Sequence, residues 1–517
     1  MKVFLMYPHR NIDSDMGLPW NETVLIQDLE LNRILENMAN GDKFLYEISK
    51  KVLLNMENEE ETILYRQSVL KDCIKNSSQV REIYDILMRS IKEEKRQYFW
   101  FSQTNPELIL HESIKVIQIF INGFNSLRKI SDRSWDDFES DGFKSLFSII
   151  RNELDSNYLS SIENHLRALK FPGGVPISVK LGRGNEGVNY TLLKMKEKKS
   201  RLSSLMSTGR MKRYTFTLGD RDESGAQAIV EMRNRGIINI TNVLKESAEQ
   251  VLGFFDMLRN ELAFYIGCLN LYEHITGKGE PTCFPIPVKG NEDILSFSGL
   301  YDISLSLGLS EKTVGNDLQA DGKDLAIITG TNRGGKSTFL RSVGQAYLMM
   351  QCGMYVPAVS FRSDLRTGIF THFKKEEDKE MTMGKLDEEL NRMSIMIEHI
   401  TRGSIVLFNE SFSATNTREG SEISRNIVNA LIENGIKVLF VSHLYEFSIS
   451  FYERRRKETL FLRAERRSDG THTYRIIEGN PLETSHSEDL YNRIFRNTDN
   501  GGERGDLSGI NQEATHL

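Results

Sequence analysis

The fold class of this chain is decided by one stretch, Thr329-Gly330-Thr331-Asn332-Arg333-Gly334-Gly335-Lys336-Ser337-Thr338. The stretch fits the phosphate-loop pattern G-x-x-x-x-G-K-[ST] at every fixed position. An apolar run at 325–328 predicts a strand before it, and residues 339–343 predict the opening of a helix after it. A glycine-rich turn in this setting points backbone N–H groups and the positive end of the helix dipole into one concavity. The stretch therefore predicts a nucleotide-binding site.

The side chains and the backbone of this loop have separate predicted roles. Lys336 would contact the β- and γ-phosphates of ATP, and the Ser337 hydroxyl would bind Mg²⁺. A glycine-rich turn that merely happens to precede a helix is the alternative interpretation. The predicted nucleotide-binding residues of the loop are Gly330, Thr331, Asn332, Arg333, Gly334, Gly335, Lys336, Ser337 and Thr338.

Length and composition describe a soluble globular protein with several domains. The chain has 517 residues, of which 39% are apolar and 27% are charged, and roughly two to four domains are expected. Its net charge of −6 requires any nucleic-acid contact to come from a local basic patch. The four cysteines lie far apart without metal-ligand spacing, and no apolar run is long enough for a signal peptide or a membrane helix. We therefore expect a cytoplasmic protein without a membrane contact.

Upstream of the loop, the pattern is mainly helical and is interrupted once. From residue 24 to about 171, apolar residues recur at spacings of three and four, and a further helix is expected at about 243–274. Between them, turn residues and alternating apolar residues predict a small β-rich insertion at about 172–239. Its strands are expected at 175–179 and 214–218.

The insertion holds a strongly basic segment. Between Lys194 and Arg213 there are eight Lys and Arg residues and one acid, Glu197, which gives a net charge of +7. A cluster of this kind can neutralise DNA phosphates, so we predict a DNA contact here. A solvated loop is an equal alternative, because runs of charge are often only exposed surface.

An acidic group follows a second predicted strand. The apolar run at 404–408 ends in Asn409 and Glu410. We predict that Glu410 is the general base that orients a water toward the γ-phosphate of ATP. Asn409 and Glu410 would join Ser337 at the Mg²⁺ site. The alternative is an ordinary acidic residue at a strand end.

A histidine follows a third predicted strand. The run at 437–441 ends in Ser442 and His443, and parallel strands collect ligand-binding groups at their carboxyl ends. His443 would sense the γ-phosphate through a hydrogen bond. A solvated histidine is the alternative.

These residues carry a family resemblance. Residues 330–341 are similar to the nucleotide loop of the MutS DNA mismatch-repair ATPases, in which an Asn precedes the x-G-G-K-S-T core. The resemblance continues in Gly353-Met354-Tyr355-Val356-Pro357-Ala358, in 409–420, which is similar to the family's acidic pair and T-S-T-x-D-G signature, and in Ser442-His443. It covers about 280–446, and it extends more weakly over 20–275, where 27–31 and 66–70 resemble the start of the helical lever region. Residues 484–491 resemble the family's small C-terminal helical piece.

The resemblance implies an ATPase of the ABC-like class that works as a dimer, and we expect a homodimer, with a heterodimer as the alternative. ATP would control a clamp of helical levers around DNA, in repair or recombination, and the signature segment of one subunit would complete the site of the other. Lys336, Glu410 and His443 would be catalytic. Contacts to the nucleotide outside the loop would come from Val314 and Asn316, and from Thr415, Asn416 and Thr417 at the start of a helix at 419–433.

The sequence departs from the family's pattern at several points. Asn409 stands where the family has Asp, so we expect slow hydrolysis. Asn416 replaces the signature serine, and Thr313 stands where the family has an aromatic residue that stacks on adenine. No Phe-x-Glu wedge occurs in an equivalent context, and neither a mismatch-reading domain nor a nuclease domain fits within the chain. We therefore do not expect selective recognition of mismatches.

The predicted architecture is multidomain, α plus α/β. A helical lever and core region would span 1–275 and include the β-rich insertion. An ABC-like P-loop ATPase domain with a mainly parallel sheet would span 276–480 and close with a hairpin around Ser468-Asp469-Gly470. A short helix at 488–495 and a disordered tail would fill 481–517.

Three functions are compatible with this sequence. The first is a MutS-like, DNA-binding ATPase. The second is a nucleotide-switched binding protein with little hydrolysis, which the replacement of the family's Asp by Asn409 suggests. The third is an ABC-type ATPase that serves a protein partner without binding DNA.

Overall fold

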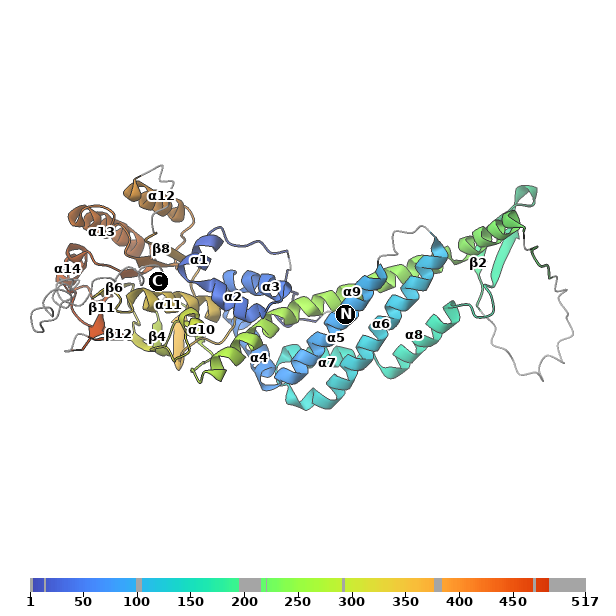
Figure 1. The fold of residues 1–517 in the computed structure, drawn as a ribbon, viewed down its shortest axis with the longest axis horizontal. Helices are drawn as coiled ribbons and strands as arrows, with labels where there is room; N and C mark the ends of the chain where they lie inside the picture. Colours follow the sequence, from blue (N-terminus) through green and yellow to red (C-terminus); the bar gives the residue numbers. More distant parts are fainter. Residues whose placement is uncertain are drawn as a thin grey trace, which may run out of the picture. The chain divides into compact units, whose positions relative to one another are not determined.

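The computed structural model describes residues 3–13, 15–98, 105–194, 215–219, 221–290, 293–375, 384–467 and 471–482. The chain divides into two compact units (Figure 1). Unit 1 contains Met1–Met16, Asp42–Ser49 and Leu64–Asn270, and unit 2 contains Gly17–Gly41, Lys50–Ile63 and Leu271–Leu517. The sequence interpretation placed all of 1–275 in one helical region. Within that range, residues 17–41, 50–63 and 271–275 pack with unit 2.

The chain is mixed α/β. Its α-helices are α1 Glu22–Asp28, α2 Leu31–Ala39, α3 Lys43–Leu54, α4 Glu60–Lys75, α5 Ser77–Tyr98, α6 Pro106–Ser134, α7 Asp141–Asn152, α8 Ser156–Leu169, α9 Glu223–Gly277, α10 Ile303–Gly308, α11 Lys336–Gln351, α12 Lys385–Ile397, α13 Thr417–Glu433 and α14 Tyr445–Glu453. Its strands are β1 Ile177–Leu181, β2 Gly187–Leu192, β3 Ile286–Val288, β4 Leu295–Leu300, β5 Asn316–Gln319, β6 Leu325–Thr329, β7 Ser360–Asp364, β8 Ile369–Phe373, β9 Ile405–Asn409, β10 Lys437–Val441, β11 Thr459–Arg466 and β12 His472–Glu478.

Unit 1 is built on long helices that lie side by side, among them α5, α6 and α9 (Figure 1). Aromatic rings join α6 to α9, with 4.7 Å between the ring centroids of Phe120 and Phe255. Gly123 permits this approach, because a Cβ there would lie 2.9 Å from Ser90 Oγ on α5 and 3.0 Å from the Phe255 ring. The apolar residues at helical spacing therefore form the core of this unit, as the sequence predicted.

A buried carboxylate holds the N-terminal segment of unit 1. Glu261, on α9, is fully buried. Its side chain accepts hydrogen bonds from the backbone N–H groups of Leu5 at 2.9 Å, Met6 at 2.7 Å and Ile12 at 2.6 Å. Burial raises the pKa of Glu261, and the three N–H donors and Arg66 oppose that shift. One side chain thus fixes the path of residues 5–12.

Removing this carboxylate should destabilise unit 1. We expect Glu261→Ala to lower the free energy of unfolding by about 3 kcal/mol, because three buried N–H donors lose their acceptor. Glu249→Ala, on an exposed side chain of the same helix, is the matched control and should change it by less than about 0.5 kcal/mol. Urea denaturation followed by circular dichroism measures both. Equal midpoints for the two variants would contradict the account.

The β-rich insertion is smaller than the sequence suggested. Strands β1 and β2 pair antiparallel, but α9 already begins at Glu223 and runs for 55 residues. The predicted limit at 239 and the predicted helix start at 243 were therefore wrong. Ile229, Val230 and Met232 are exposed on the first turns of α9. This part of the helix therefore lacks the buried apolar stripe by which sequence analysis recognises a helix.

Two further predictions concern the segment that follows β2. The strand expected at 214–218 is absent from residues 215–218, and residue 214 lies outside the described residues. The basic segment between Lys194 and Arg213 also lies outside them, except for Lys194 itself.

Unit 2 is organised around a six-stranded sheet with the order β12-β11-β6-β10-β9-β8. Strands β8, β9, β10, β6 and β11 are parallel, and β12 pairs antiparallel with β11. The predicted strands at 325–328, 404–408 and 437–441 correspond to β6, β9 and β10, and the predicted hairpin corresponds to β11 and β12. The turn at 468–470 and the predicted helix at 488–495 lie outside the described residues.

Helices cover both faces of this sheet (Figure 1). Side chains of α12, α13 and α14 pack on one face, where Phe408 and Phe440 lie in the same apolar cluster as Val428 and Phe447. On the other face α11 approaches closely, since a Cβ at Gly344 would lie 2.9 Å from the side chain of Leu407. A second sheet has the order β3-β7-β4-β5.

The register of the parallel strands places three strand ends at one level. Val441 pairs with Ile328 on one side and with Asn409 on the other. The segments that follow β6, β9 and β10 therefore leave the sheet at the same edge, which is where open parallel sheets bind ligands. No helix within the described residues is both long enough and apolar enough to cross a bilayer.

Candidate functional site

The loop between β6 and α11 is a tight turn against the neighbouring hairpin. It contains left-handed residues at Gly330, with φ 119°, and at Gly335, with φ 89°. A Cβ at Gly330 would lie 3.0 Å from the backbone nitrogen of Ala464 on β11, so a larger residue would push the loop away from this strand. Lys336 is the first residue of α11. The N-terminus of that helix therefore points into the loop, as a phosphate site requires.

The side chain of Lys336 is hydrogen-bonded to the backbone of its own loop. Its side chain is 4% exposed, and Nζ donates hydrogen bonds to the carbonyl oxygens of Gly330 at 3.0 Å and Thr331 at 2.8 Å. Burial lowers the pKa of Lys336 to about 8, and the nearby Glu410 carboxylate opposes the shift. A phosphate beside this ammonium would stabilise its charged form.

Polar residues at the ends of β9 and β10 and at the start of α11 form two hydrogen-bonded pairs at the same edge. Ser337 Oγ donates to Asn409 Oδ1 at 2.9 Å. His443 Nε2 lies 3.0 Å from Glu410 Oε1, and this hydrogen bond is the largest of the causes that lower the pKa of Glu410, followed by the charges of His443, Lys336 and Lys374. Glu410 is therefore a carboxylate at neutral pH, and Nε2 of His443 carries the proton that it shares.

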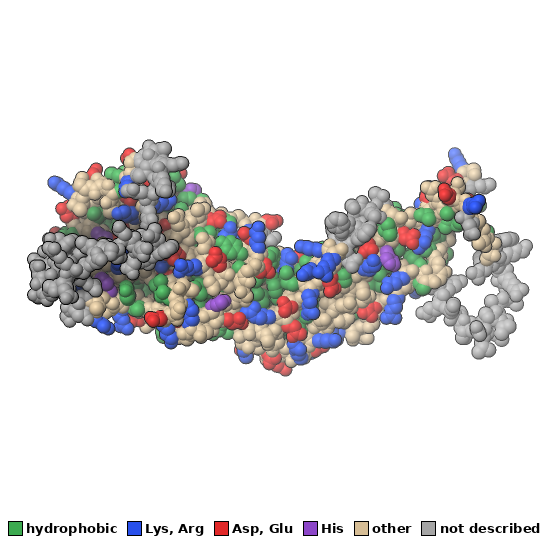
Figure 2. Space-filling view, viewed as in Figure 1, with side chains coloured by type: hydrophobic (Ala, Val, Ile, Leu, Met, Phe, Trp, Pro, Cys, Tyr) green, Lys and Arg blue, Asp and Glu red, His purple; other side chains and the backbone are tan. Residues whose placement is uncertain are grey.

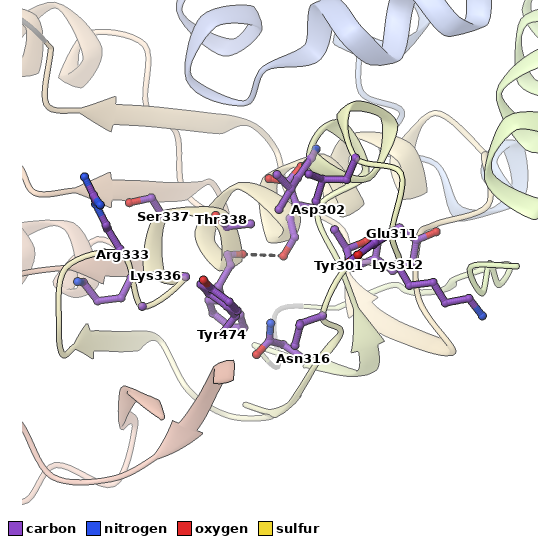
Figure 3. A pocket seen from close by; sticks show the side chains of 18 of the residues that line it. Tyr301, Asp302, Glu311, Lys312, Asn316, Arg333, Lys336, Ser337, Thr338 and Tyr474 are labelled. Atoms are coloured by element: carbon purple, nitrogen blue, oxygen red, sulfur yellow. Dashed lines mark hydrogen bonds between the residues drawn. The ribbon is translucent and has the colours of Figure 1, made fainter. Parts of the chain in front are cut away.

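A cavity of about 610 Å³ opens beside the loop (Figure 3). That size suits a small-molecule ligand. Of the predicted site residues, the cavity is lined by Val314, Asn316, Asn332, Arg333, Gly334, Gly335, Lys336, Ser337, Thr338 and Glu410. The structure thus brings together the loop, Val314 and Asn316, which are predicted to contact the nucleotide, and Glu410, which is the predicted general base.

Some predicted residues lie beside the cavity and do not line it. Gly330 and Thr331 contact Lys336 through their carbonyl oxygens. Asn409 contacts Ser337 and lines a neighbouring cavity of about 330 Å³. His443 reaches the site through Glu410.

The predicted signature residues Thr415, Asn416 and Thr417 do not line this cavity. They form the N-terminus of α13, where Asn416 Oδ1 accepts from the backbone N–H of Glu419 at 2.9 Å. Thr415 Oγ1 donates to the Glu419 carboxylate.

Sequence reasoning missed Tyr474. This residue lines the cavity from β12 (Figure 3), is 52% exposed and has a left-handed φ of 59°. Thr313, in contrast, turns its hydroxyl toward Glu280 Oε1, at 2.5 Å. Tyr474 therefore offers an aromatic ring to the cavity, where the sequence suggested none. Sequence analysis did not single it out, because it interpreted the run at 472–477 only as a strand of a hairpin.

Nucleotide binding should depend on pH because the pKa of Lys336 is near 8. A bound triphosphate raises that pKa, so binding takes up a proton and affinity falls as pH rises above about 8. We expect the Kd for ATP to increase about tenfold between pH 7 and pH 9. Titration with a fluorescent ATP analogue measures this, and Lys336→Arg should abolish the dependence since guanidinium does not titrate in this range. A flat Kd in the wild type would contradict the assignment.

The fold and the geometry define an α/β protein with a glycine-rich loop that opens a helix at the edge of a parallel sheet. Two family models match the chain, the MutS2 N-terminal domain over residues 58–278 and MutS domain V over residues 326–487. The chain belongs to the MutS family.

Individual relatives match over shorter stretches. The DNA mismatch repair protein MutS of Thermotoga neapolitana is 34% identical over 169 residues, which are 32% of this chain and 21% of the relative. A probable DNA mismatch repair protein Msh6 of Drosophila melanogaster is 36% identical over 136 residues, 26% of this chain and 11% of the relative. The endonuclease MutS2 of Lacticaseibacillus paracasei is 25% identical over 278 residues, 50% of this chain and 35% of the relative. The chain therefore spans about a third or less of the length of each.

Proposed function

We propose that this chain is a MutS-like, ATP-dependent DNA-binding protein that hydrolyses ATP in DNA repair or recombination. One observation carries the proposal. A single cavity brings together a buried lysine in a glycine-rich loop, a serine paired with Asn409, and an ionised Glu410 held by His443. Phosphoryl transfer needs positioning and charge stabilisation more than covalent chemistry, and these groups supply both.

The residues of the cavity fit ATP with Mg²⁺. Among the described residues, the hydrogen bonds of the Lys336 ammonium go to two carbonyl oxygens of its own loop. These acceptors are neutral, so a phosphate that took their place would form a stronger, charge-assisted hydrogen bond. Ser337 Oγ, Asn409 Oδ1 and the Glu410 carboxylate are oxygen donors of the kind that Mg²⁺ binds. Tyr474 and Asn316 line the same cavity and would contact the base. Mg²⁺, when bound, would neutralise charge on the β- and γ-phosphates.

Glu410 would act as the general base. Its carboxylate is ionised at neutral pH and is oriented by Nε2–H of His443, so it can accept a hydrogen bond from a water and direct that water to the γ-phosphate. Lys336 would stabilise the charge that spreads over the phosphate oxygens in the transition state. His443 would hold Glu410 and sense the γ-phosphate.

The domain arrangement and the partners belong to the same proposal. Residues 276–480 would form an ABC-like P-loop ATPase domain that dimerises, with Thr415, Asn416 and Thr417 of one copy completing the site of the other. Residues 1–275 would form the DNA-contacting levers. On the face drawn in Figure 2, basic and acidic side chains are interspersed over the helices. The segment between Lys194 and Arg213 is the candidate DNA contact because of its net charge of +7.

A nucleotide switch with little hydrolysis is the second candidate. It is favoured by Asn409, whose neutral amide accepts from Ser337 at 2.9 Å and brings no negative charge to the metal. ATP would then be held long enough to control binding of DNA without rapid turnover.

One experiment tests the proposal. ATP turnover and gel mobility shifts are measured for the full chain with homoduplex, mismatched and four-way-junction DNA. The proposal predicts DNA binding whose strength changes with ATP, and slow turnover that DNA alters. Measurable turnover without any DNA binding would favour an ATPase that serves a protein partner. DNA binding with no turnover would favour the switch.

A further inference from the structure

The segment that carries Glu410 is held in an unfavourable backbone conformation. Glu410 has φ 55° and Phe412 has φ 58°, and non-glycine residues in this region persist only where neighbouring groups fix them. On one side, the N-terminus of α13 fits closely, because a Cβ at Gly420 would lie 2.4 Å from the carbonyl oxygen of Phe412. The opposite side is fixed by His372 and Glu389, neither of which lines the cavity.

His372 joins this segment to α12. The side chain lies at the end of β8 and is 1% exposed. Nδ1 lies 2.8 Å from Ser411 Oγ, and Nε2 lies 3.0 Å from the carbonyl oxygen of Glu389 on α12. The imidazole also stacks on Phe412, with 5.1 Å between centroids and 17° between planes. One buried ring therefore contacts both residues that follow Glu410.

The hydrogen-bond partners determine the tautomer of His372. A carbonyl oxygen only accepts, so Nε2 must carry the proton that it gives to Glu389. Burial and the charge of Arg392 lower the pKa of His372 to about 4, which leaves Nδ1 unprotonated and able to accept from Ser411. The single hydroxyl proton of Ser411 is shared between Nδ1 and the carbonyl oxygen of His372, at 2.5 Å.

Glu389 provides a second connection from the same turn of α12. Its side chain is 5% exposed. Burial raises the pKa of its carboxyl, and the nearby backbone N–H of Phe412 opposes that shift. Arg392, one turn further along, donates to the carbonyl oxygen of Phe373 at 3.1 Å. Helix α12 thus contacts both the end of β8 and the segment after Glu410.

We propose that His372 and Glu389 are positioning residues that hold Glu410 in its active geometry and couple it to the position of α12. This inference rests on the proposed function, because Glu410 is taken as the general base. It assigns α12 as the element whose displacement switches hydrolysis off while the nucleotide stays bound. Neither residue touches the nucleotide cavity, so the effect should fall on turnover and spare binding.

The two nitrogens of His372 can be tested separately. In His372→Asn the amide takes the place of Nδ1 and loses the contact to Glu389. In His372→Gln it takes the place of Nε2 and loses the contact to Ser411. We expect each variant to lower kcat for ATP at least tenfold and to change the Kd for ATP less than threefold. His399→Gln is the matched control, because His399 lies on the surface of the same unit and stacks on Trp20, and it should change neither quantity.

A conservative replacement provides the second test. Glu389→Ala should lower kcat at least tenfold, and Glu389→Gln should keep it within threefold of the wild type, because the amide oxygen can still face the backbone N–H of Phe412. In a Glu410→Gln background, His372→Gln should cause no further loss, since it acts through the missing carboxylate. An additive loss in that background, or equal kcat for Glu389→Ala and the wild type, would overturn the coupling.

Hydrogen exchange separates failure of this inference from failure of the proposed function. It needs no ATP turnover and reports the fold of each variant. In His372→Gln the amides at 408–414 should exchange at least tenfold faster, and in His372→Asn those at 385–393 should do so, while those of β6 keep wild-type rates. Wild-type exchange in both segments would overturn the inference. Faster exchange in the His372 variants, found together with a wild type that does not hydrolyse ATP, would support the coupling and contradict the proposed function.

Discussion

Lys336→Met is expected to reduce affinity for ATP at least a hundredfold and to leave no measurable hydrolysis. Methionine has similar length and fits a buried site, but it removes the positive charge and the donors that would contact the phosphates. Loss of a charge-assisted hydrogen bond costs about 1.5–3 kcal/mol, and the lost charge at the transition state adds to it. Isothermal titration with ATP and Mg²⁺ measures the affinity.

The control for this prediction is stability. The free energy of unfolding of Lys336→Met without nucleotide should equal or exceed that of the wild type, because a buried ammonium with a lowered pKa is replaced by an apolar group. In the wild type, ATP should raise the melting temperature, and in the variant it should not. An ATP affinity within threefold of the wild type would show that the loop is not the phosphate site.

Glu410→Gln is expected to lower kcat for ATP by about 100- to 1,000-fold, which is within the contribution of a general base. The amide keeps the size of the side chain and its contact with His443, but it cannot accept a proton from water. Binding of ATP should persist, and a stable ATP complex should accumulate. Single-turnover hydrolysis and the Kd are measured on the same preparation.

The comparison with the wild type separates the two candidate functions. Strong loss of turnover in Glu410→Gln identifies an enzyme. Equal, negligible turnover in both proteins identifies a nucleotide switch. Asn409 would then be the residue that keeps hydrolysis slow. Asn409→Asp, which introduces a carboxylate beside Ser337, should then increase turnover if the missing charge limits hydrolysis.

The sequence predicted the parts of the fold that depend on local pattern. The strands β6, β9 and β10 are short runs whose apolar residues are buried, and the loop after β6 has fixed glycine positions. The meeting of Lys336, Ser337 and Glu410 followed from the rule that parallel strands present their carboxyl ends at one edge. These predictions needed no knowledge of distant contacts.

Other parts depend on contacts that local pattern does not contain. The first turns of α9 are exposed, so no apolar stripe marked the helix before residue 243. The assignment of residues 17–41 and 50–63 to unit 2 depends on tertiary packing, as shown by Gln345, whose side chain donates to the carbonyl oxygen of Leu29 at 3.0 Å. Tyr474 reaches the cavity through a left-handed backbone conformation, which alternation along a strand does not predict.

We expect the loop at 330–338 to bind the triphosphate of ATP. A crystal structure of the full chain with a non-hydrolysable ATP analogue and Mg²⁺ tests it most directly. We expect Lys336 Nζ to leave the carbonyl oxygens of Gly330 and Thr331 and to contact the β- and γ-phosphates, with the adenine beside Tyr474. An analogue bound elsewhere, or a Lys336 that still donates to both carbonyl oxygens in the complex, would contradict this expectation.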